Sequence, residues 1–195
     1  MNLNFRLILA SASPRRRQLL LGLDLPVEVT STDVDETPPA GMPIEQVAEH
    51  LALKKANAYS GQLAEDQVLI TADTTVIVDE HLLNKPESAA DAQRMLGLLA
   101  GRTHKVVTGV CLRTADHTIA FSDIAEVTFA ALTPEEIAYY VERHKPFDKA
   151  GAYGVQDWIG YAAVERINGS FYTVMGLPLH RVYRALNELA ITTAK

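Results

Sequence analysis

The sequence predicts an α/β fold, because short strand-like runs alternate with helical segments along its 195 residues. Phe5 to Ala10 and residues 67–72 are nearly continuous apolar runs, which are typical of strands covered on both faces. Helices are marked by start signals such as Ser13-Pro14 and Thr133-Pro134. With 48% hydrophobic residues the chain can bury a full core, as one domain or as two lobes around a cleft. We expect one compact domain over residues 1–195.

Composition narrows the classes of function. A formal net charge of −6 gives no reason to expect a nucleic-acid partner, since such binding needs extended basic surface. No apolar stretch approaches the roughly 20 residues that span a bilayer, so we expect no membrane association. Cys111 is the only cysteine, which excludes an intrachain disulfide and favours a reducing compartment. The first apolar run precedes its arginines, unlike that of a signal peptide, and we expect a cytoplasmic protein.

The segment after the first predicted strand has unusual electrostatics. Ser13 is a suitable N-cap and Pro14 a suitable first helical residue, and residues 15–17 then place three arginines in the first turn. Cations there oppose the helix dipole, at a cost of roughly 0.3 to 1 kcal/mol each. A bound anion would offset this cost, since serine hydroxyls, backbone donors and guanidinium groups suit a phosphate chain. The alternative is a solvated basic helix end.

Two charged residues in the middle of the chain do not fit a purely structural role. A helix is expected from Pro43 to about Ser60, and Lys55 falls in the centre of its apolar stripe. Such a lysine either extends to solvent or meets a buried negative group, and both remain open for Lys55. Asp73 interrupts a β-favouring run at residues 67–78. It marks either a bulge or, as we favour, a carboxylate held at a strand end for chemistry.

The remaining segments are more ordinary. Residues 32–39 form an acidic, proline-containing loop in which Glu36 is ambiguous between a solvated and a functional role. Small residues in the loop 148–156 allow either close backbone approach or a flexible connection. The other expected elements are a helix from Ser88 to Ala100, a hairpin of residues 104–113 and 118–129, a helix from Thr133 to His144, a second hairpin of residues 161–167 and 171–175 joined by Asn168-Gly169, and a terminal helix ending near Ala190.

Several short blocks, in this order, resemble the Maf family of nucleoside triphosphate pyrophosphatases. The resemblance spans nearly the whole chain and rests on the blocks at residues 9–16, 34–36, 54–56, 72–74, 85–86, 148–156, 168–170 and 176–178. It implies a mixed twisted sheet with flanking helices, in two lobes around a nucleotide cleft, similar to the inosine triphosphate pyrophosphatases. Ala12 departs from the family, where Gly or Thr is frequent, but remains compatible with a tight turn.

The resemblance also implies roles for individual residues. The family's catalytic acid position falls on Asp73, which would serve as base, metal ligand or both, and Glu36 falls on a carboxylate beside a divalent metal, Mg²⁺ or Mn²⁺. The phosphate-binding positions fall on Ser11, Arg15, Arg16, Lys55 and Lys85. A homodimer is frequent in the family.

The expected substrates follow from three further positions. Arg15, Thr74 and Gln156 match the branch that hydrolyses dTTP and UTP, whereas Trp, Gln and Glu would indicate 7-methyl-GTP. Gln156 offers both a donor and an acceptor for the edge of uracil or thymine. The expected function is therefore hydrolysis of dTTP and UTP, or modified pyrimidine nucleotides, to monophosphate and pyrophosphate, which limits incorporation of non-standard nucleotides into nucleic acids. The alternatives are a non-enzymatic nucleotide-binding regulator of cell division and a purine-directed pyrophosphatase.

Overall fold

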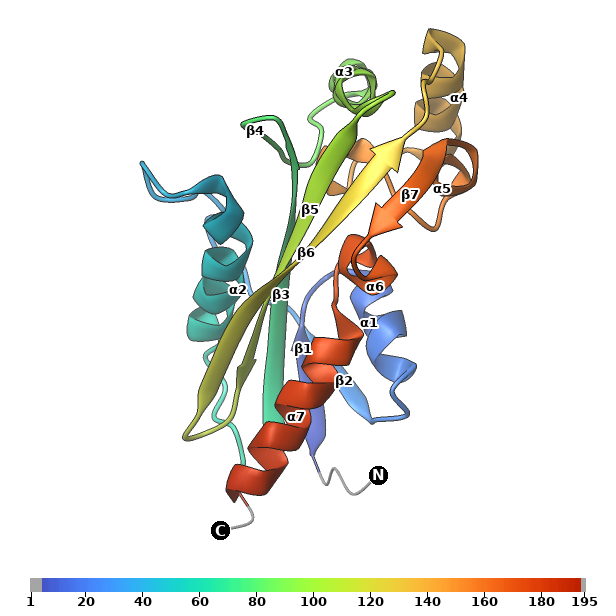
Figure 1. The fold of residues 1–195 in the computed structure, drawn as a ribbon. Helices are drawn as coiled ribbons and strands as arrows, with labels where there is room; N and C mark the ends of the chain where they lie inside the picture. Colours follow the sequence, from blue (N-terminus) through green and yellow to red (C-terminus); the bar gives the residue numbers. More distant parts are fainter. Residues whose placement is uncertain (1–4, 194–195) are drawn as a thin grey trace. The chain divides into compact units, whose positions relative to one another are not determined.

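A computed structural model of the chain describes residues 5–193 (Figure 1). Its contacts divide the chain into two compact units. Unit 1 contains the chain up to Asp73, the segment Thr108–Asp123 and the chain from Gly176 onward, and unit 2 contains Thr74–Val107 and Ile124–Met175. A single domain over residues 1–195 stays a prediction. No helix among the described residues is long and apolar enough to cross a membrane.

The predicted α/β class is confirmed by a seven-stranded mixed sheet whose strands alternate with helices along the chain. Its strand order is β2-β1-β3-β5-β6-β7, and β4 pairs with β3. The strands are β1 (Arg6–Ala10), β2 (Val27–Thr30), β3 (Gln67–Val78), β4 (His81–Leu83), β5 (Thr103–Arg113), β6 (Thr118–Phe129) and β7 (Val164–Asn168). The strands β3, β5 and β6 contribute residues to both units.

Unit 1 is built on parallel strands. β1 pairs in parallel with β2 on one side and with β3 on the other, and Leu7 to Ala10 are buried, as expected for a strand covered on both faces. The helical elements of unit 1 are α1 (Pro14–Leu21), the short 3-10 helix η1 (Ile44–Gln46), α2 (Val47–Ala58) and α7 (Leu179–Thr193). A small core of Ile8, Ala52, Leu69 and Cys111 joins α2 to the strands, and burial raises the pKa of the Cys111 thiol to about 11.

Unit 2 contains the remaining helices and the antiparallel strand pairs β3–β4 and β6–β7. Its helical elements are α3 (Ala89–Leu99), α4 (Pro134–His144), the 3-10 helix η2 (Ala150–Ala152), α5 (Trp158–Ala163) and α6 (Phe171–Met175). The expected capping is present, since Ser88 accepts from the Asp91 N–H and Thr133 forms a capping box with Glu136. The two helices thus begin where the sequence predicts.

The predicted second hairpin is wrong. Residues 161–163 of the expected first strand belong instead to α5, β7 covers only Val164–Asn168 and pairs with β6, and Phe171–Met175 forms α6. A two-residue Asn-Gly hairpin turn needs positive φ at both residues, but of this pair only Gly169 has it, at 130°. The carbonyl of Ser170 then accepts the N–H groups of Thr173 and Val174, which starts a helix in place of a returning strand.

Helix α2 differs from its predicted bounds and packs unusually close to the sheet. It begins after η1 and ends at Ala58, before the expected stop at Gly61. A Cβ atom at Gly109 of β5 would lie 2.3 Å from the main chain of Ala48, a distance that no side chain tolerates. Glycine in this strand therefore permits direct contact between the backbones of α2 and β5.

Candidate functional site

Arg16 connects the turn between β1 and α1 to two other segments of unit 1. Its Nε donates to the carbonyl of Gly176 at 2.8 Å, and its Nη1 donates to the carbonyl of Ala72 at 2.8 Å and to Ser11 Oγ at 3.4 Å. Ser11 Oγ also accepts the N–H of Ser13, whereas Ser13 occupies the N-cap position without a side-chain cap bond. Burial lowers the pKa of Arg16, and the neighbouring Asp73 opposes this shift. The predicted phosphate-binding arginine thus also has a structural role.

Three of the predicted site residues meet in unit 1. Lys55 Nζ lies 2.5 Å from Asp73 Oδ1 and 2.7 Å from Glu36 Oε1. The side chains of Lys55 and Asp73 are only 12% and 13% exposed, and that of Glu36 is 46% exposed. Of the two alternatives open for Lys55, the structure therefore selects the buried negative partner. We call these three side chains the charged cluster.

The sequence favoured a position for Asp73 at a strand end, but β3 continues through this residue to Val78. The last pair between β1 and β3 is Leu9 with Ile70, so β3 has left this neighbour shortly before Asp73. A carboxylate is tolerated here because it pairs with the Lys55 ammonium. The poor strand propensity of aspartate thus marked a charged contact and not a break in the strand, and a chemical role for Asp73 stays a prediction.

A buried hydrogen bond positions Lys55 against Asp73. Thr71 Oγ1 donates to the carbonyl of Ala52 at 2.6 Å. Thr71 and Asp73 are two residues apart on β3 and share one face, while Ala52 lies one helical turn before Lys55. The bond therefore fixes α2 along β3 at the height where the ion pair forms.

The acidic loop is held on α2 by both lysines of the Lys54-Lys55 pair. Lys54 Nζ donates to the carbonyl of Asp35 at 2.5 Å, beside the contact of Lys55 with Glu36. Asp35 caps its own turn by accepting the N–H of Thr37, and hydrogen bonds from Thr37 lower the pKa of the Asp35 carboxyl. The loop thus places Glu36 beside Lys55, and its functional role stays a prediction.

Three predicted site residues, Thr74, Lys85 and Gln156, belong to unit 2. Thr74 follows Asp73 on β3 and is half-buried, and Lys85 is exposed in the loop after β4. That loop contacts the predicted loop 148–156, since the carbonyl of Asn84 accepts the N–H of Gly151. A Cβ at Gly151 would lie 3.0 Å from Val76, and the φ of this glycine is 66°. The small residues of the loop therefore permit close packing on β3, not a flexible connection.

Gln156 lies in the same loop, within a polar network of unit 2. Its Nε2 donates to Asp157 Oδ1 at 3.2 Å, and Asp157 Oδ2 accepts the hydroxyl of Tyr140 at 3.0 Å. Burial raises the pKa of Tyr140, so its hydroxyl keeps the proton that it donates. Lys149 Nζ lies 2.8 Å from Asp148 and 3.7 Å from Asp157. The third predicted specificity position, Arg15, is half-buried on α1 in unit 1.

The donor set of the charged cluster suits a hard divalent cation that is shared with a substrate. Glu36 and Asp73 direct two carboxylates at one cation, the Lys55 ammonium. No group of three or more His, Cys, Asp or Glu side chains that could hold a metal occurs within residues 5–193. Mg²⁺ is commonly held by one or two carboxylates together with substrate phosphates and water. The residues therefore fit such an ion, but not a metal cage made by protein groups alone.

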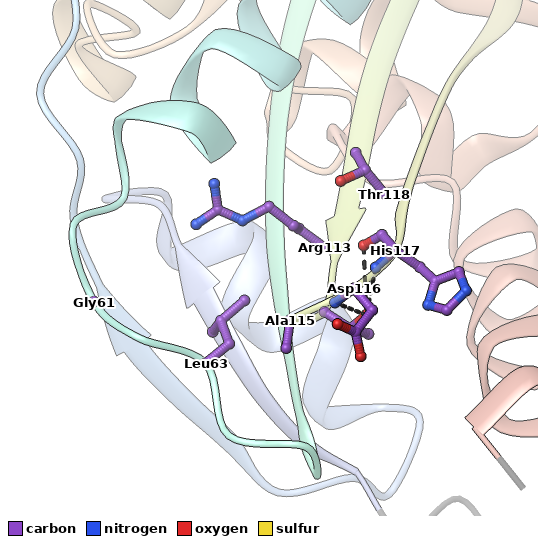
Figure 2. A pocket seen from close by; sticks show the side chains of 8 residues that line it. Gly61, Leu63, Arg113, Ala115, Asp116, His117 and Thr118 are labelled. Atoms are coloured by element: carbon purple, nitrogen blue, oxygen red, sulfur yellow. Dashed lines mark hydrogen bonds between the residues drawn. The ribbon is translucent and has the colours of Figure 1, made fainter.

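A separate pocket lies at the tip of the β5–β6 hairpin in unit 1. It has a volume of about 340 Å³ and is lined by Gly61, Leu63 and residues 113–118, which include no predicted site residue (Figure 2). The turn is closed by the hydrogen bond from the His117 N–H to Thr114 Oγ1 at 3.0 Å (Figure 2). Arg113, on its wall, contacts the carbonyl and the ring of Tyr59. The pocket is thus distinct from the charged cluster.

Sequence reasoning missed the residues that support the site. Thr71 gave no signal beyond its residue type, and Lys54 stood out only as part of the block at residues 54–56. Gly109 did carry one, because an isolated glycine in a valine-rich strand indicates close backbone approach. Asp157 and Tyr140 are separated by 17 positions, so no local pattern links them.

Comparisons with known proteins identify the family of this chain. The family model described as Maf-like protein matches residues 6–189. The chain is 51% identical over 187 residues to a dTTP/UTP pyrophosphatase of Porphyromonas gingivalis, with 94% of each chain covered. It is 47% identical to the protein of that name from Parabacteroides distasonis, covering 94% of this chain and 96% of the relative, and 46% identical to that of Bacteroides thetaiotaomicron, covering 95% and 96%. The chain therefore belongs to the Maf family.

Proposed function

We propose that this protein is a nucleoside triphosphate pyrophosphatase that hydrolyses dTTP and UTP, or modified forms of these, to the monophosphate and pyrophosphate. The observation that carries the proposal is the convergence of Glu36 and Asp73 on Lys55, with both carboxylates close enough to Arg16 to act on its charge. The relatives named dTTP/UTP pyrophosphatase support the choice of substrate.

In the proposed reaction, water attacks the α-phosphorus and the bond from this phosphorus to the oxygen that bridges to the β-phosphate breaks. Asp73 accepts a proton from the attacking water, and the bridging oxygen leaves with pyrophosphate. Lys55 shifts its charge from Asp73 toward the phosphates, which frees the carboxylate to act as base and neutralises the leaving group. Arg15, Arg16 and Lys85 add positive charge for the triphosphate.

Glu36 and Asp73 are the residues that would hold Mg²⁺ or Mn²⁺. When bound, such an ion supplies positive charge that polarises phosphate oxygens and favours deprotonation of water. The support from this chain is the pair of carboxylates at one cation position. A binding-only regulator would gain nothing from two carboxylates near a polyanion, because they repel it in the absence of a cation.

The remaining parts of the proposal rest on the Maf resemblance and on composition. They are a single domain over residues 1–195, a homodimer, a cytoplasmic location and a role in limiting incorporation of non-standard nucleotides. Size-exclusion chromatography with light scattering measures the oligomeric state.

A panel of nucleoside triphosphates tests the proposed function, with pyrophosphate and orthophosphate measured separately. We expect pyrophosphate from dTTP and UTP in the presence of Mg²⁺ or Mn²⁺, and little from ITP. Orthophosphate as the first product, or nucleotide binding without turnover, would contradict the proposal. Preference for ITP would instead indicate a purine-directed enzyme.

A further inference from the structure

The amide of Gln156 is held by a shielded carboxylate. Gln156 Nε2 donates to Asp157 Oδ1, while Asp157 Oδ2 accepts from the Tyr140 hydroxyl and lies 3.7 Å from Lys149 Nζ. The side chains of Asp157 and Lys149 are 21% and 12% exposed. Because little water reaches these groups, the orientation of each is determined by its protein partners.

Gly154 is the residue that makes room for this arrangement. A Cβ at this position would lie 2.6 Å from Asp157 Oδ2 and 2.8 Å from Gln156 Nε2. The Gly154 N–H donates to the Tyr140 hydroxyl at 3.1 Å, and the Gly154 carbonyl accepts the N–H of Asp157 at 2.9 Å. The hydroxyl of Tyr140 is therefore fixed as acceptor toward Gly154 and as donor toward Asp157.

These contacts determine which way the Gln156 amide faces. An ionised carboxylate only accepts hydrogen bonds, so it selects the NH₂ group of Gln156 and opposes the flipped amide, which would bring two acceptors together. Gln156 Oε1 is left buried and has no hydrogen-bond partner among the described residues. A buried carbonyl oxygen of this kind is unfavourable until a donor reaches it. Contact with a ligand requires the atoms that cover this oxygen to move.

We propose that Asp157, held by Tyr140 and Lys149, is a positioning residue that makes the protein select uracil and thymine over cytosine. It fixes Gln156 so that Oε1 accepts the N3–H of the base, while the second hydrogen of Nε2 is available to the neighbouring ring carbonyl. Cytosine presents the reverse pattern, an N3 acceptor beside an amino donor, which matches only the flipped amide. This inference rests on the proposed function and on Gln156 as the residue that contacts the base.

The substitution Asp157→Asn tests the inference. Asparagine both donates and accepts, so it allows either orientation of the Gln156 amide. We expect the ratio of kcat/KM for UTP to that for CTP to fall at least about 5-fold, because a mismatched buried hydrogen bond is no longer enforced. Much of the change should come from increased activity on CTP, which mere loss of folding does not produce.

A second variant and a control keep the test decisive. Tyr140→Phe removes the hydroxyl but keeps the ring, which stacks on His144 and Trp158, and should lower the same ratio. Asp148→Asn is the matched control, since Asp148 also pairs with Lys149 but is 55% exposed. The control should leave the UTP to CTP ratio unchanged.

The outcomes separate this inference from the proposed function. An unchanged ratio in both Asp157→Asn and Tyr140→Phe, with a wild type that prefers UTP, would overturn the inference alone. If Asp157→Asn does not fold, Tyr140→Phe decides the question. A wild type that hydrolyses UTP and CTP equally also overturns the inference, whereas one that releases no pyrophosphate from any nucleotide refutes the proposed function as well.

Discussion

Replacing Lys55 by methionine tests the charged cluster through stability, independently of turnover. Methionine retains a flexible apolar chain of similar length but lacks the ammonium group. Asp73 then keeps a carboxylate that is 13% exposed and has lost the cation at 2.5 Å from its Oδ1. Glu36 is affected less, because its side chain is 46% exposed and water replaces the lost partner.

The loss of stability expected for Lys55→Met lies between two limits. Exposed ion pairs contribute about 0.2 to 1 kcal/mol, whereas removal of one partner from a fully buried pair costs about 3 to 5 kcal/mol. The pair of Lys55 and Asp73 is mostly but not fully buried, so we expect Lys55→Met to lower the free energy of unfolding by about 1 to 3 kcal/mol. Adding Asp73→Asn removes the unpaired charge, and the double variant should recover most of this loss.

Urea denaturation of the wild type, the two single variants and the double variant measures the coupling between these residues. We expect a coupling free energy of about 1 to 3 kcal/mol. Lys54→Met is the control, since Lys54 binds the carbonyl of Asp35 and should combine with Asp73→Asn additively within about 0.5 kcal/mol. If the stability effects of Lys55→Met and Asp73→Asn add within the same limit, their ion pair contributes nothing to stability. That result would refute the geometry of the charged cluster.

Three further predictions concern catalysis, packing and pH. Asp73→Asn should reduce kcat for dTTP at least about 100-fold in steady-state assays, and near wild-type turnover would move the base role to Glu36. Gly109→Ala should destabilise the protein by about 1 to 3 kcal/mol, because its Cβ would collide with α2. The control Gly97→Ala places its Cβ where no atom lies within 4 Å, and it should stabilise α3 by about 0.5 to 1 kcal/mol. Equal denaturation midpoints for both variants would contradict this packing. Burial lowers the pKa of His104 to about 4 from 6.5, so only the unfolded chain gains a proton as the pH falls between these values. This residue should therefore leave stability unchanged above that window and remove up to about 3 kcal/mol below it, and His104→Gln should flatten this part of the measured stability curve relative to wild type.

Local signals in the sequence predicted most of the elements, and they failed where tertiary contacts decide. The helix starts at Ser88 and Thr133 were correct because their caps are made by neighbouring residues. Residues 161–163 and 171–175 were expected in strands, yet they lie in the helices α5 and α6. Burial of Ile159 and Ala163 in the core of unit 2 outweighs the modest strand propensity of this segment.

The candidate site was predictable as a set of residues but not as a set of contacts. A lysine on an apolar helical stripe and an aspartate within a strand are both costly alone, and the structure pairs them. What the sequence could not show is the height of α2 along β3, which depends on Gly109 and on the bond from Thr71 to Ala52. These contacts join residues far apart in the chain, and no local periodicity encodes them.

The most direct test of the proposed chemistry is hydrolysis of dTTP in water enriched in the heavy oxygen isotope, with the products separated and weighed by mass spectrometry. Attack at the α-phosphorus, with Asp73 accepting the proton, predicts that the label enters the monophosphate and that pyrophosphate is unlabelled. The Asp73→Asn variant should show the same labelling at a much lower rate. Label in pyrophosphate or in orthophosphate would place the attack on another phosphorus and contradict the account.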